Sequence, residues 1–173
     1  MLRSDRCRSE VVTAMPNALL AAGVPAPDFT LHATPDQTLS LQELRGAPVV
    51  LVFYPADWSA VCGDELVVFN QALPLIRKQG GVVLGISVDS AWCHQAFAKD
   101  RNLHFDLLAD FEPKGAISRL YGAYDEVHGC SKRALFVIDG RGAIAWSYLS
   151  PTAINPGADG VLDALDQLAK ETP

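Results

Sequence analysis

The sequence predicts a single α/β domain with a mixed central sheet covered by helices on both faces. Two wholly apolar runs, Val49–Phe53 and Val82–Ile86, are typical of parallel strands buried on both sides. The segment between them is amphipathic, and a strand–helix–strand unit of this length forms a right-handed parallel crossover. Two later segments, Ala134–Ile138 and Ala143–Tyr148, flank Asp139-Gly140-Arg141-Gly142 and predict an antiparallel hairpin. A length of 173 residues suits one such domain.

Shorter elements precede and follow this unit. Residues 25–31 predict an extended segment that enters an edge strand, and Thr38–Leu41 predicts a second short strand before a helical turn around Leu44. After the second buried run we expect a helix, a short strand and another helix, at Ala91–Lys99, Phe105–Ala109 and Pro113–Leu120. A final helix has an apolar inner face made of Val161, Leu162, Leu165 and Leu168.

The helix of the central unit is expected from about Ser59 to about Lys78, ended by Gly80-Gly81. Its apolar stripe has 3–4–3 spacing and consists of Leu66, Phe69, Leu73 and Ile76. The complete order β-α-β-α-β-β-α matches the thioredoxin-like fold. We expect residues 1–24 to form an N-terminal tail, partly disordered, and residues 25–173 to form the single domain.

Composition excludes several classes of function. The chain is 49% hydrophobic and 20% charged with a net charge of −6, which argues against a nucleic-acid partner. No apolar run approaches the length of a membrane span, and the arginine-containing N-terminus lacks the apolar stretch of a secretory signal. Cysteines stand at positions 7, 62, 93 and 130, without zinc-ligand spacing. We therefore expect free thiols in a reducing cytoplasm, with no metal and no cofactor.

Cys62 follows the first buried strand and lies at the expected start of the long helix. With Ser59 as N-cap, Cys62 is the third residue of the first turn, where exposed backbone N–H groups favour a thiolate over a thiol. No second cysteine follows within three residues, so a Cys-x-x-Cys disulfide exchanger is disfavoured. The alternative is a buried core thiol, since Cys62 also continues the apolar stripe of the helix.

The pattern Pro-x-x-x-Ser/Thr-x-x-Cys at this junction favours the reactive interpretation, since it has a chance frequency of about 2% in a chain of this composition. The run Phe53–Glu65 resembles the peroxidatic-cysteine segment of peroxiredoxins. The resemblance extends over about residues 24–170 through further segments in the right order: Pro27-Asp28-Phe29, Gly85–Ser90 followed by His94, and Arg133–Asp139. The segment Leu107–Phe111 with Gly115-Ala116 is similar to the bacterial alkyl hydroperoxide reductase E subgroup.

The resemblance implies a thiol-dependent peroxidase that reduces hydrogen peroxide and organic hydroperoxides, with Cys62 as the nucleophile that becomes a sulfenic acid. It further implies that Pro55 shields the sulfur, Ser59 donates to the bound peroxide and Arg133 stabilises negative charge. The family more often has threonine at the position of Ser59. Glu65 matches a family acid that orients the arginine or the loop; a solvated helix residue is the alternative.

The sequence does not identify the thiol that reduces the sulfenic acid. Candidate resolving cysteines are Cys93, on the helix after the second buried run, and Cys130, three residues before Arg133 and expected along the same strand. A one-cysteine mechanism would instead use an external reductant: a thioredoxin, glutaredoxin or mycoredoxin type of protein, or a low-molecular-weight thiol. His94 and His128 are expected as surface residues or as core residues with satisfied hydrogen bonds rather than as catalytic bases, because a thiolate needs no separate base.

Two other functions remain open from the sequence. A peroxide sensor or redox relay would pass the oxidation of Cys62 to a partner thiol, and a binding module would use Cys62 only as core filler. A homodimer is expected from the family resemblance.

Overall fold

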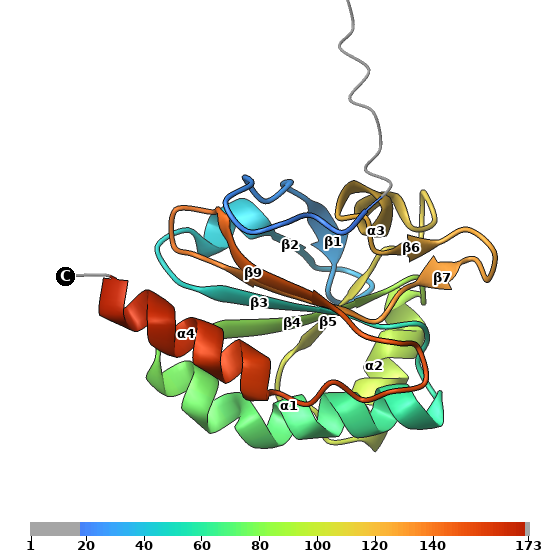
Figure 1. Cartoon of the computed structure of the whole chain (residues 1–173). Helices are drawn as coiled ribbons and strands as arrows, with labels where there is room; N and C mark the ends of the chain where they lie inside the picture. Colours follow the sequence, from blue (N-terminus) through green and yellow to red (C-terminus); the bar gives the residue numbers. More distant parts are fainter. Residues whose placement is uncertain (1–17, 172–173) are drawn as a thin grey trace, which may run out of the picture.

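The computed structural model describes residues 18–171. Its main sheet has seven strands in the order β2-β1-β5-β4-β3-β8-β9, and a separate two-stranded sheet pairs β6 with β7 (Figure 1). The strands are β1 (Thr30–His32), β2 (Thr38–Ser40), β3 (Val49–Phe53), β4 (Val82–Ser87), β5 (Asp106–Ala109), β6 (Tyr124–Asp125), β7 (Cys130–Ser131), β8 (Ala134–Ile138) and β9 (Ile144–Leu149). The helices are the 3-10 turn η1 (Leu41–Leu44) and the α-helices α1 (Ala60–Lys78), α2 (Ala91–Asp100), α3 (Ala116–Leu120) and α4 (Asp159–Glu171).

Strand β3 is the centre of the sheet, and all five of its residues are buried. It pairs in parallel with β4, from Val49 opposite Val82 to Phe53 opposite Ile86, and antiparallel with β8 on its other side. Strand β8 in turn pairs antiparallel with β9. The parallel crossover, the hairpin and the mixed sheet predicted from the apolar runs are confirmed, and the fold is thioredoxin-like.

Side chains alternate along β3 between two core layers, because successive residues of a strand point to opposite faces. Val50 and Val52 pack against α1, α2 and α4, which cover one face of the sheet (Figure 1). Leu51 and Phe53 face the other layer, which includes Tyr121 at the end of α3. Each helix layer therefore hides one side of the central strand, as a sheet with a parallel centre requires.

Helix α1 has the expected apolar stripe, all of it buried: Cys62, Leu66, Phe69, Leu73 and Ile76. It ends in a Schellman motif, in which the Gly80 N–H donates to the Arg77 carbonyl and the Gly81 N–H to the Ile76 carbonyl. Gly80 has φ of 74°, a left-handed conformation in which glycine has no Cβ to clash. This termination turns the chain back into β4.

Two features differ from the expectations. The sequence did not predict β6 and β7, which are two residues each, too short to show strand periodicity. Cys130 consequently lies in β7 and pairs with Asp125; it does not share a strand with Arg133, which immediately precedes β8. The expectation that Cys130 and Arg133 lie along the same strand is wrong.

The last residues of the expected tail are packed against the domain. The Leu20 N–H donates to the Tyr121 carbonyl, and the Gly23 N–H to the Ile144 carbonyl. Leu19 and Leu20 also contact the core layer that contains Tyr121. Residues 1–17 of the expected tail lie outside the described residues, as do residues 172–173 at the other end.

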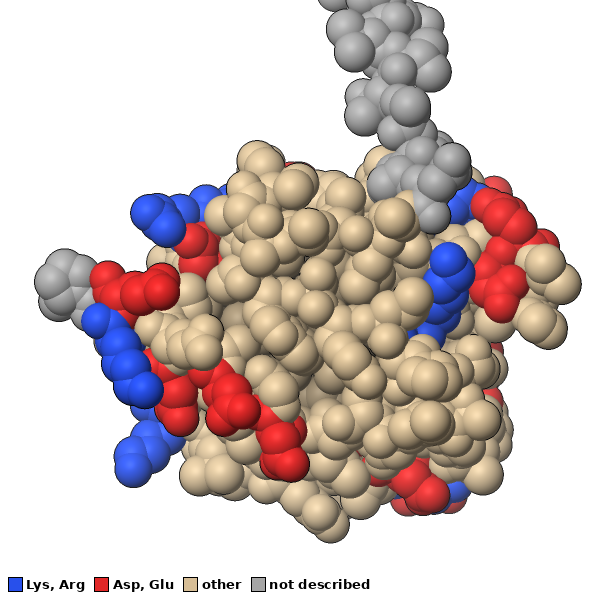
Figure 2. All heavy atoms as spheres, viewed as in Figure 1, with Lys and Arg blue, Asp and Glu red and all other residues tan. Residues whose placement is uncertain are grey.

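Between residues 18 and 171, no helix is both long enough and apolar enough to cross a membrane. Figure 2 shows a face whose centre is largely uncharged, with acidic side chains following α4 and basic side chains scattered at the edges. This distribution agrees with the net negative charge of the chain.

Candidate functional site

The candidate site lies where β3 ends and the chain turns into α1. The Tyr54 N–H donates to the Ile86 carbonyl at 3.1 Å, which extends the β3–β4 pairing by one residue. Helix α1 begins at Ala60, so Cys62 is its third residue, as expected. Ser59 is the N-cap, but its side chain makes no capping hydrogen bond. The Ser59 hydroxyl is therefore not used by the helix terminus.

Arg133 brings a buried cation to the sulfur of Cys62. Its Nη2 donates to Cys62 Sγ at 3.4 Å, and its Nε donates to the Thr152 carbonyl at 3.1 Å. Arg133 and Cys62 have exposed fractions of only 1% and 0%. A guanidinium is permanently cationic, and burial reduces the screening of its charge at the sulfur that it contacts.

Glu65 is the second partner of Arg133. It lies one helical turn after Cys62, so both side chains face the same guanidinium, and Arg133 Nη1 donates to Glu65 Oε2. The carboxyl is wholly buried, and the solvated alternative is therefore wrong. Burial raises the pKa of Glu65 to about 7, with the attraction of Arg133 acting in the opposite direction. Glu65 Oε1 has no hydrogen-bond partner among the described residues.

The other two described cysteines lie in different surroundings. Cys93 is half-buried near the start of α2, with its sulfur facing the carboxylates of Asp57 and Asp89. Burial, followed by the hydrogen bond and charge of Asp57, raises the pKa of the Cys93 thiol to about 11. Cys93 is therefore a protonated thiol at neutral pH.

Cys130, in β7, is also half-buried. Burial and then the charge of Asp125 raise its pKa, and the charge of Cys62 adds a smaller effect in the same direction. Cys62, Cys93 and Cys130 are all free.

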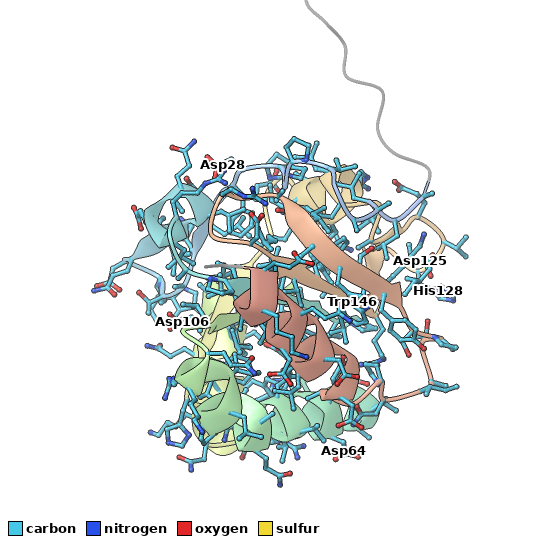
Figure 3. The ribbon with its side chains drawn as sticks, turned by 60° about the vertical axis from the view of Figure 1, so that its left-hand side comes forward. Asp28, Asp64, Asp106, Asp125, His128 and Trp146 are labelled. Carbon is cyan, nitrogen blue, oxygen red and sulfur yellow. The ribbon has the colours of Figure 1, made fainter. Side chains whose placement is uncertain are left out.

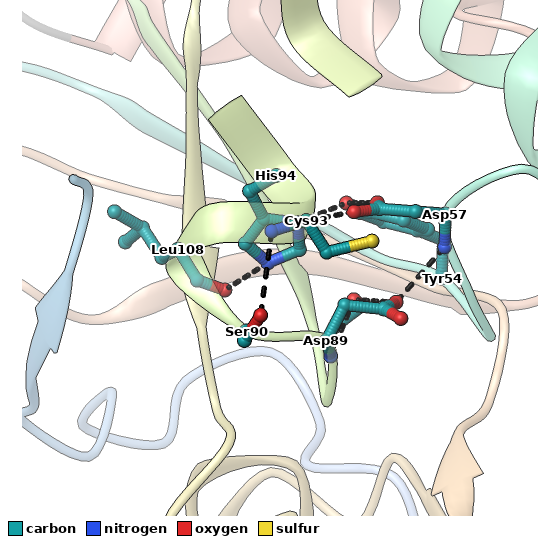
Figure 4. Close-up of polar contacts among 8 residues, drawn as sticks. Tyr54, Asp57, Asp89, Ser90, Cys93, His94 and Leu108 are labelled. Atoms are coloured by element: carbon teal, nitrogen blue, oxygen red, sulfur yellow. Dashed lines mark hydrogen bonds and ion pairs between the residues drawn. The ribbon is translucent and has the colours of Figure 1, made fainter. Parts of the chain in front are cut away.

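A polar cluster beside the site was not predicted from the sequence. Tyr54, Asp57 and His94 are buried and joined by hydrogen bonds (Figure 4). His94 is a satisfied core residue, one of its two expected placements: Nδ1 contacts the carboxylate of Asp57 at 2.9 Å, and Nε2 contacts the Leu108 carbonyl. Asp57 follows β3 and His94 lies in α2, and their spacing in the sequence gives no sign that the two side chains meet.

One group in the described range combines metal-ligating residue types: Asp57, Asp89 and Cys93, whose ligand atoms all lie within 4.8 Å of one another. Both carboxylate oxygens of Asp57 already bond to Tyr54 and His94. Asp89 Oδ2 accepts from the Ser87 hydroxyl and from the Asp57 N–H. These contacts are those of a hydrogen-bonded cluster, and we assign no ion to it.

Comparisons with known proteins identify the class. The family model described as "AhpC/TSA family" matches residues 22–147. The chain is 37% identical over 130 residues to alkyl hydroperoxide reductase E of Mycobacterium tuberculosis, covering 75% of this chain and 85% of the relative. It is 34% identical over 151 residues to a thioredoxin peroxidase of Echinococcus granulosus, covering 82% and 77%. The structure of the reduced 2-Cys peroxiredoxin of Plasmodium vivax superposes with a TM-score of 0.80 at 27% identity, covering 88% of this chain and 85% of that one.

These relatives and the thioredoxin-like fold define a peroxiredoxin, an oxidoreductase that reduces peroxides with a thiol. Within this class the chain belongs to the AhpC/TSA family.

Proposed function

We propose that Cys62 is the peroxidatic nucleophile of this peroxidase. Its thiolate sulfur forms a bond to one peroxide oxygen while the O–O bond breaks. The sulfur becomes a sulfenic acid, and the departing oxygen takes the bonding electron pair and a proton to leave as water or an alcohol. The observation that carries the proposal is the 3.4 Å contact from the Arg133 guanidinium to the buried Cys62 sulfur.

Arg133 serves two purposes in this mechanism. It stabilises the attacking thiolate, and it can donate to the oxygen that gains negative charge as the O–O bond breaks. Glu65 orients the guanidinium through its contact with Nη1. Ser59 supplies a hydroxyl donor that the helix does not use, and Pro55, which has no N–H, shields the sulfur from water. The name of the mycobacterial relative supports alkyl hydroperoxides as substrates beside hydrogen peroxide.

We propose an external thiol as the reductant of the sulfenic acid, with Cys93 and Cys130 as the competing intramolecular candidates. Cys93 is disfavoured because its sulfur faces two carboxylates, which oppose the thiolate needed for attack on Cys62. Cys130 is disfavoured because burial and the charge of Asp125 raise the pKa of its thiol, which opposes the thiolate needed for attack. The name of the Echinococcus relative supports a thioredoxin-type reductant; a glutaredoxin, a mycoredoxin or a low-molecular-weight thiol would reduce the same sulfenic acid.

We further propose a cytoplasmic homodimer. The three free thiols are typical of a reducing compartment, which supports the location. The dimer rests on the family resemblance and is tested by sedimentation or light scattering of the reduced protein.

The test is stopped-flow reaction of the reduced protein with hydrogen peroxide and with an organic hydroperoxide. Wild type is expected to consume either oxidant, and Cys62→Ser to consume none above background. The matched variants Cys93→Ser and Cys130→Ser are expected to retain the first step and, with an external thiol, the full cycle. A Cys62→Ser variant that reacts like wild type would refute the proposal. Long-lived mixed disulfides without turnover would indicate a sensor or relay instead.

A further inference from the structure

The buried cluster of Tyr54, Asp57 and His94 lies beside the loop that leads into α1 and has no part in the mechanism above (Figure 4). Tyr54 Oη donates to Asp57 Oδ1 at 2.8 Å. His94 Nδ1 lies 2.9 Å from Asp57 Oδ2, and His94 Nε2 lies 3.2 Å from the Leu108 carbonyl oxygen. Every polar atom of the Asp57 and His94 side chains thus has a partner.

The partners determine where the hydrogens are. A carbonyl oxygen only accepts, so His94 Nε2 carries a hydrogen that it donates to Leu108. A second hydrogen lies between His94 Nδ1 and Asp57 Oδ2, since two bare lone pairs would repel at 2.9 Å. The two side chains therefore share a hydrogen at this contact, hidden from water.

The backbone of Asp57 is held as firmly as its side chain. Its N–H donates to Asp89 Oδ2 at 2.9 Å, and the same oxygen accepts from the Ser87 hydroxyl at 2.7 Å. Asp57 is thus bonded to Tyr54 after β3, to Asp89 after β4 and to His94 in α2. Three elements meet at this one residue.

Asp57 lies between the two loop residues to which the proposed mechanism gives a role, Pro55 and Ser59. Asp57 follows Pro55 by two positions and precedes Ser59 by two. The intervening Trp58 has φ of 64°, a left-handed conformation that a bulky side chain adopts only where surrounding contacts impose it. Its ring packs on Phe97 of α2, with the ring centroids 5.2 Å apart. The path of the loop is thereby tied to α2 at two consecutive residues.

We propose that His94 and Asp57 are positioning residues of the peroxidase reaction, which hold loop 55–59 so that the Ser59 hydroxyl and the first turn of α1 are aimed at the oxygen that Cys62 attacks. The inference rests on the proposed role of Cys62. His94 touches no reacting atom and acts through Asp57. Since reaction rates depend steeply on the placement of donors around the reacting atoms, loss of this anchor lowers the rate even though Cys62 and Arg133 remain.

The test compares His94→Phe with Asp57→Asn. His94→Phe removes both ring hydrogen bonds, and the second-order rate constant of Cys62 with hydrogen peroxide is expected to fall about 100-fold. Asp57→Asn keeps a bonded geometry, because its amide can donate to a neutral His94 Nδ1 while its oxygen accepts from Tyr54. Its rate is expected to fall less than about tenfold, since a hydrogen bond still joins the two side chains.

Two control variants separate a loss of loop positioning from a general loss of stability. His128→Phe removes a histidine–aspartate contact of the same kind, 2.7 Å to Asp125, from the exposed turn between β6 and β7 (Figure 3), and is expected to react like wild type. Leu165→Ala destabilises α4 away from the loop and is expected to keep the wild-type rate while folded.

The proposal is overturned if folded His94→Phe reacts at the wild-type rate, or if Leu165→Ala slows as much as His94→Phe. It is also overturned if Asp57→Asn is as slow as His94→Phe, because charge rather than geometry would then matter. A wild-type protein that fails to form a Cys62 sulfenic acid would refute the proposed function itself, and with it this inference.

Discussion

Substitution of Arg133 by methionine tests the electrostatic basis of the site. At 3.4 Å, a unit positive charge and a thiolate attract each other by about 5 kcal/mol at an effective dielectric constant of about 20. Only the part of this attraction that increases in the transition state accelerates the reaction, and loss of one such donor typically costs about 100- to 1000-fold. We expect a fall of this size in the second-order rate constant of Arg133→Met with hydrogen peroxide at pH 7, measured by stopped flow.

The matched variant is Arg133→Lys. It keeps the charge but has a single ammonium group, which cannot reproduce the separate bonds from Nη1 to Glu65, from Nη2 to Cys62 and from Nε to Thr152. Its rate should lie between those of Arg133→Met and wild type. A folded Arg133→Met protein that reacts within about threefold of wild type would refute the reasoning, since the donor would then contribute far less than an oxyanion-hole group does.

Three further results follow from the environments of single residues. Burial raises the pKa of Glu65 from 4.5 in the unfolded chain to about 7 in the folded protein. Between these pH values the folded protein holds a proton on Glu65 that the unfolded chain has lost. The contribution of this group to stability is therefore lost as pH rises from 4.5 to about 7. The free energy of unfolding, measured with urea, should therefore fall in wild type relative to Glu65→Gln by up to about 3 kcal/mol between pH 4.5 and 8. Parallel pH curves for the two proteins would contradict this. Cys93, with a pKa of about 11, should be alkylated by iodoacetamide at a rate that still rises steeply above pH 9.5, as judged by peptide mass mapping; a rate that levels off there would mean that burial and the carboxylates do not raise its pKa. Leu66→Ala should lower the free energy of unfolding by about 2 to 5 kcal/mol, because the Leu66 side chain is wholly buried on the inner face of α1. A loss below about 1 kcal/mol would show that neighbouring side chains fill the space.

The sheet was predictable because its central strands are buried on both faces. Val49–Phe53 and Val82–Ile86 contain no polar residue, and a run of that kind is stable only between two layers of helices. The apolar stripe of α1 likewise identifies the face that packs on the sheet. Strands β6 and β7 could not be found in this way, because a two-residue pairing depends on contacts with the rest of the fold rather than on local pattern.

The site was predictable only in part. The spacing of Ser59 and Cys62 is local, and a strand–helix junction is recognisable from sequence. Arg133 lies 71 residues away from Cys62, and its expected place came from the family resemblance rather than from spacing. The contact between Asp57 and His94 is also long-range, and neither residue stands in a pattern that requires the other. For Glu65, the sequence was equally consistent with a solvated helix residue and with an acid that orients the arginine, and its burial in the structure excludes the solvated residue.

The most direct measurement of the central claim is mass mapping after one equivalent of hydrogen peroxide, with a sulfenic-acid trap present. We expect a single oxygen, or the trap adduct, on Cys62 within the time of peroxide loss, while Cys93 and Cys130 remain reduced thiols. In Cys62→Ser, no residue should be oxidised on that time scale. Oxidation that appears first on Cys93 or Cys130, with Cys62 unmodified, would contradict the account.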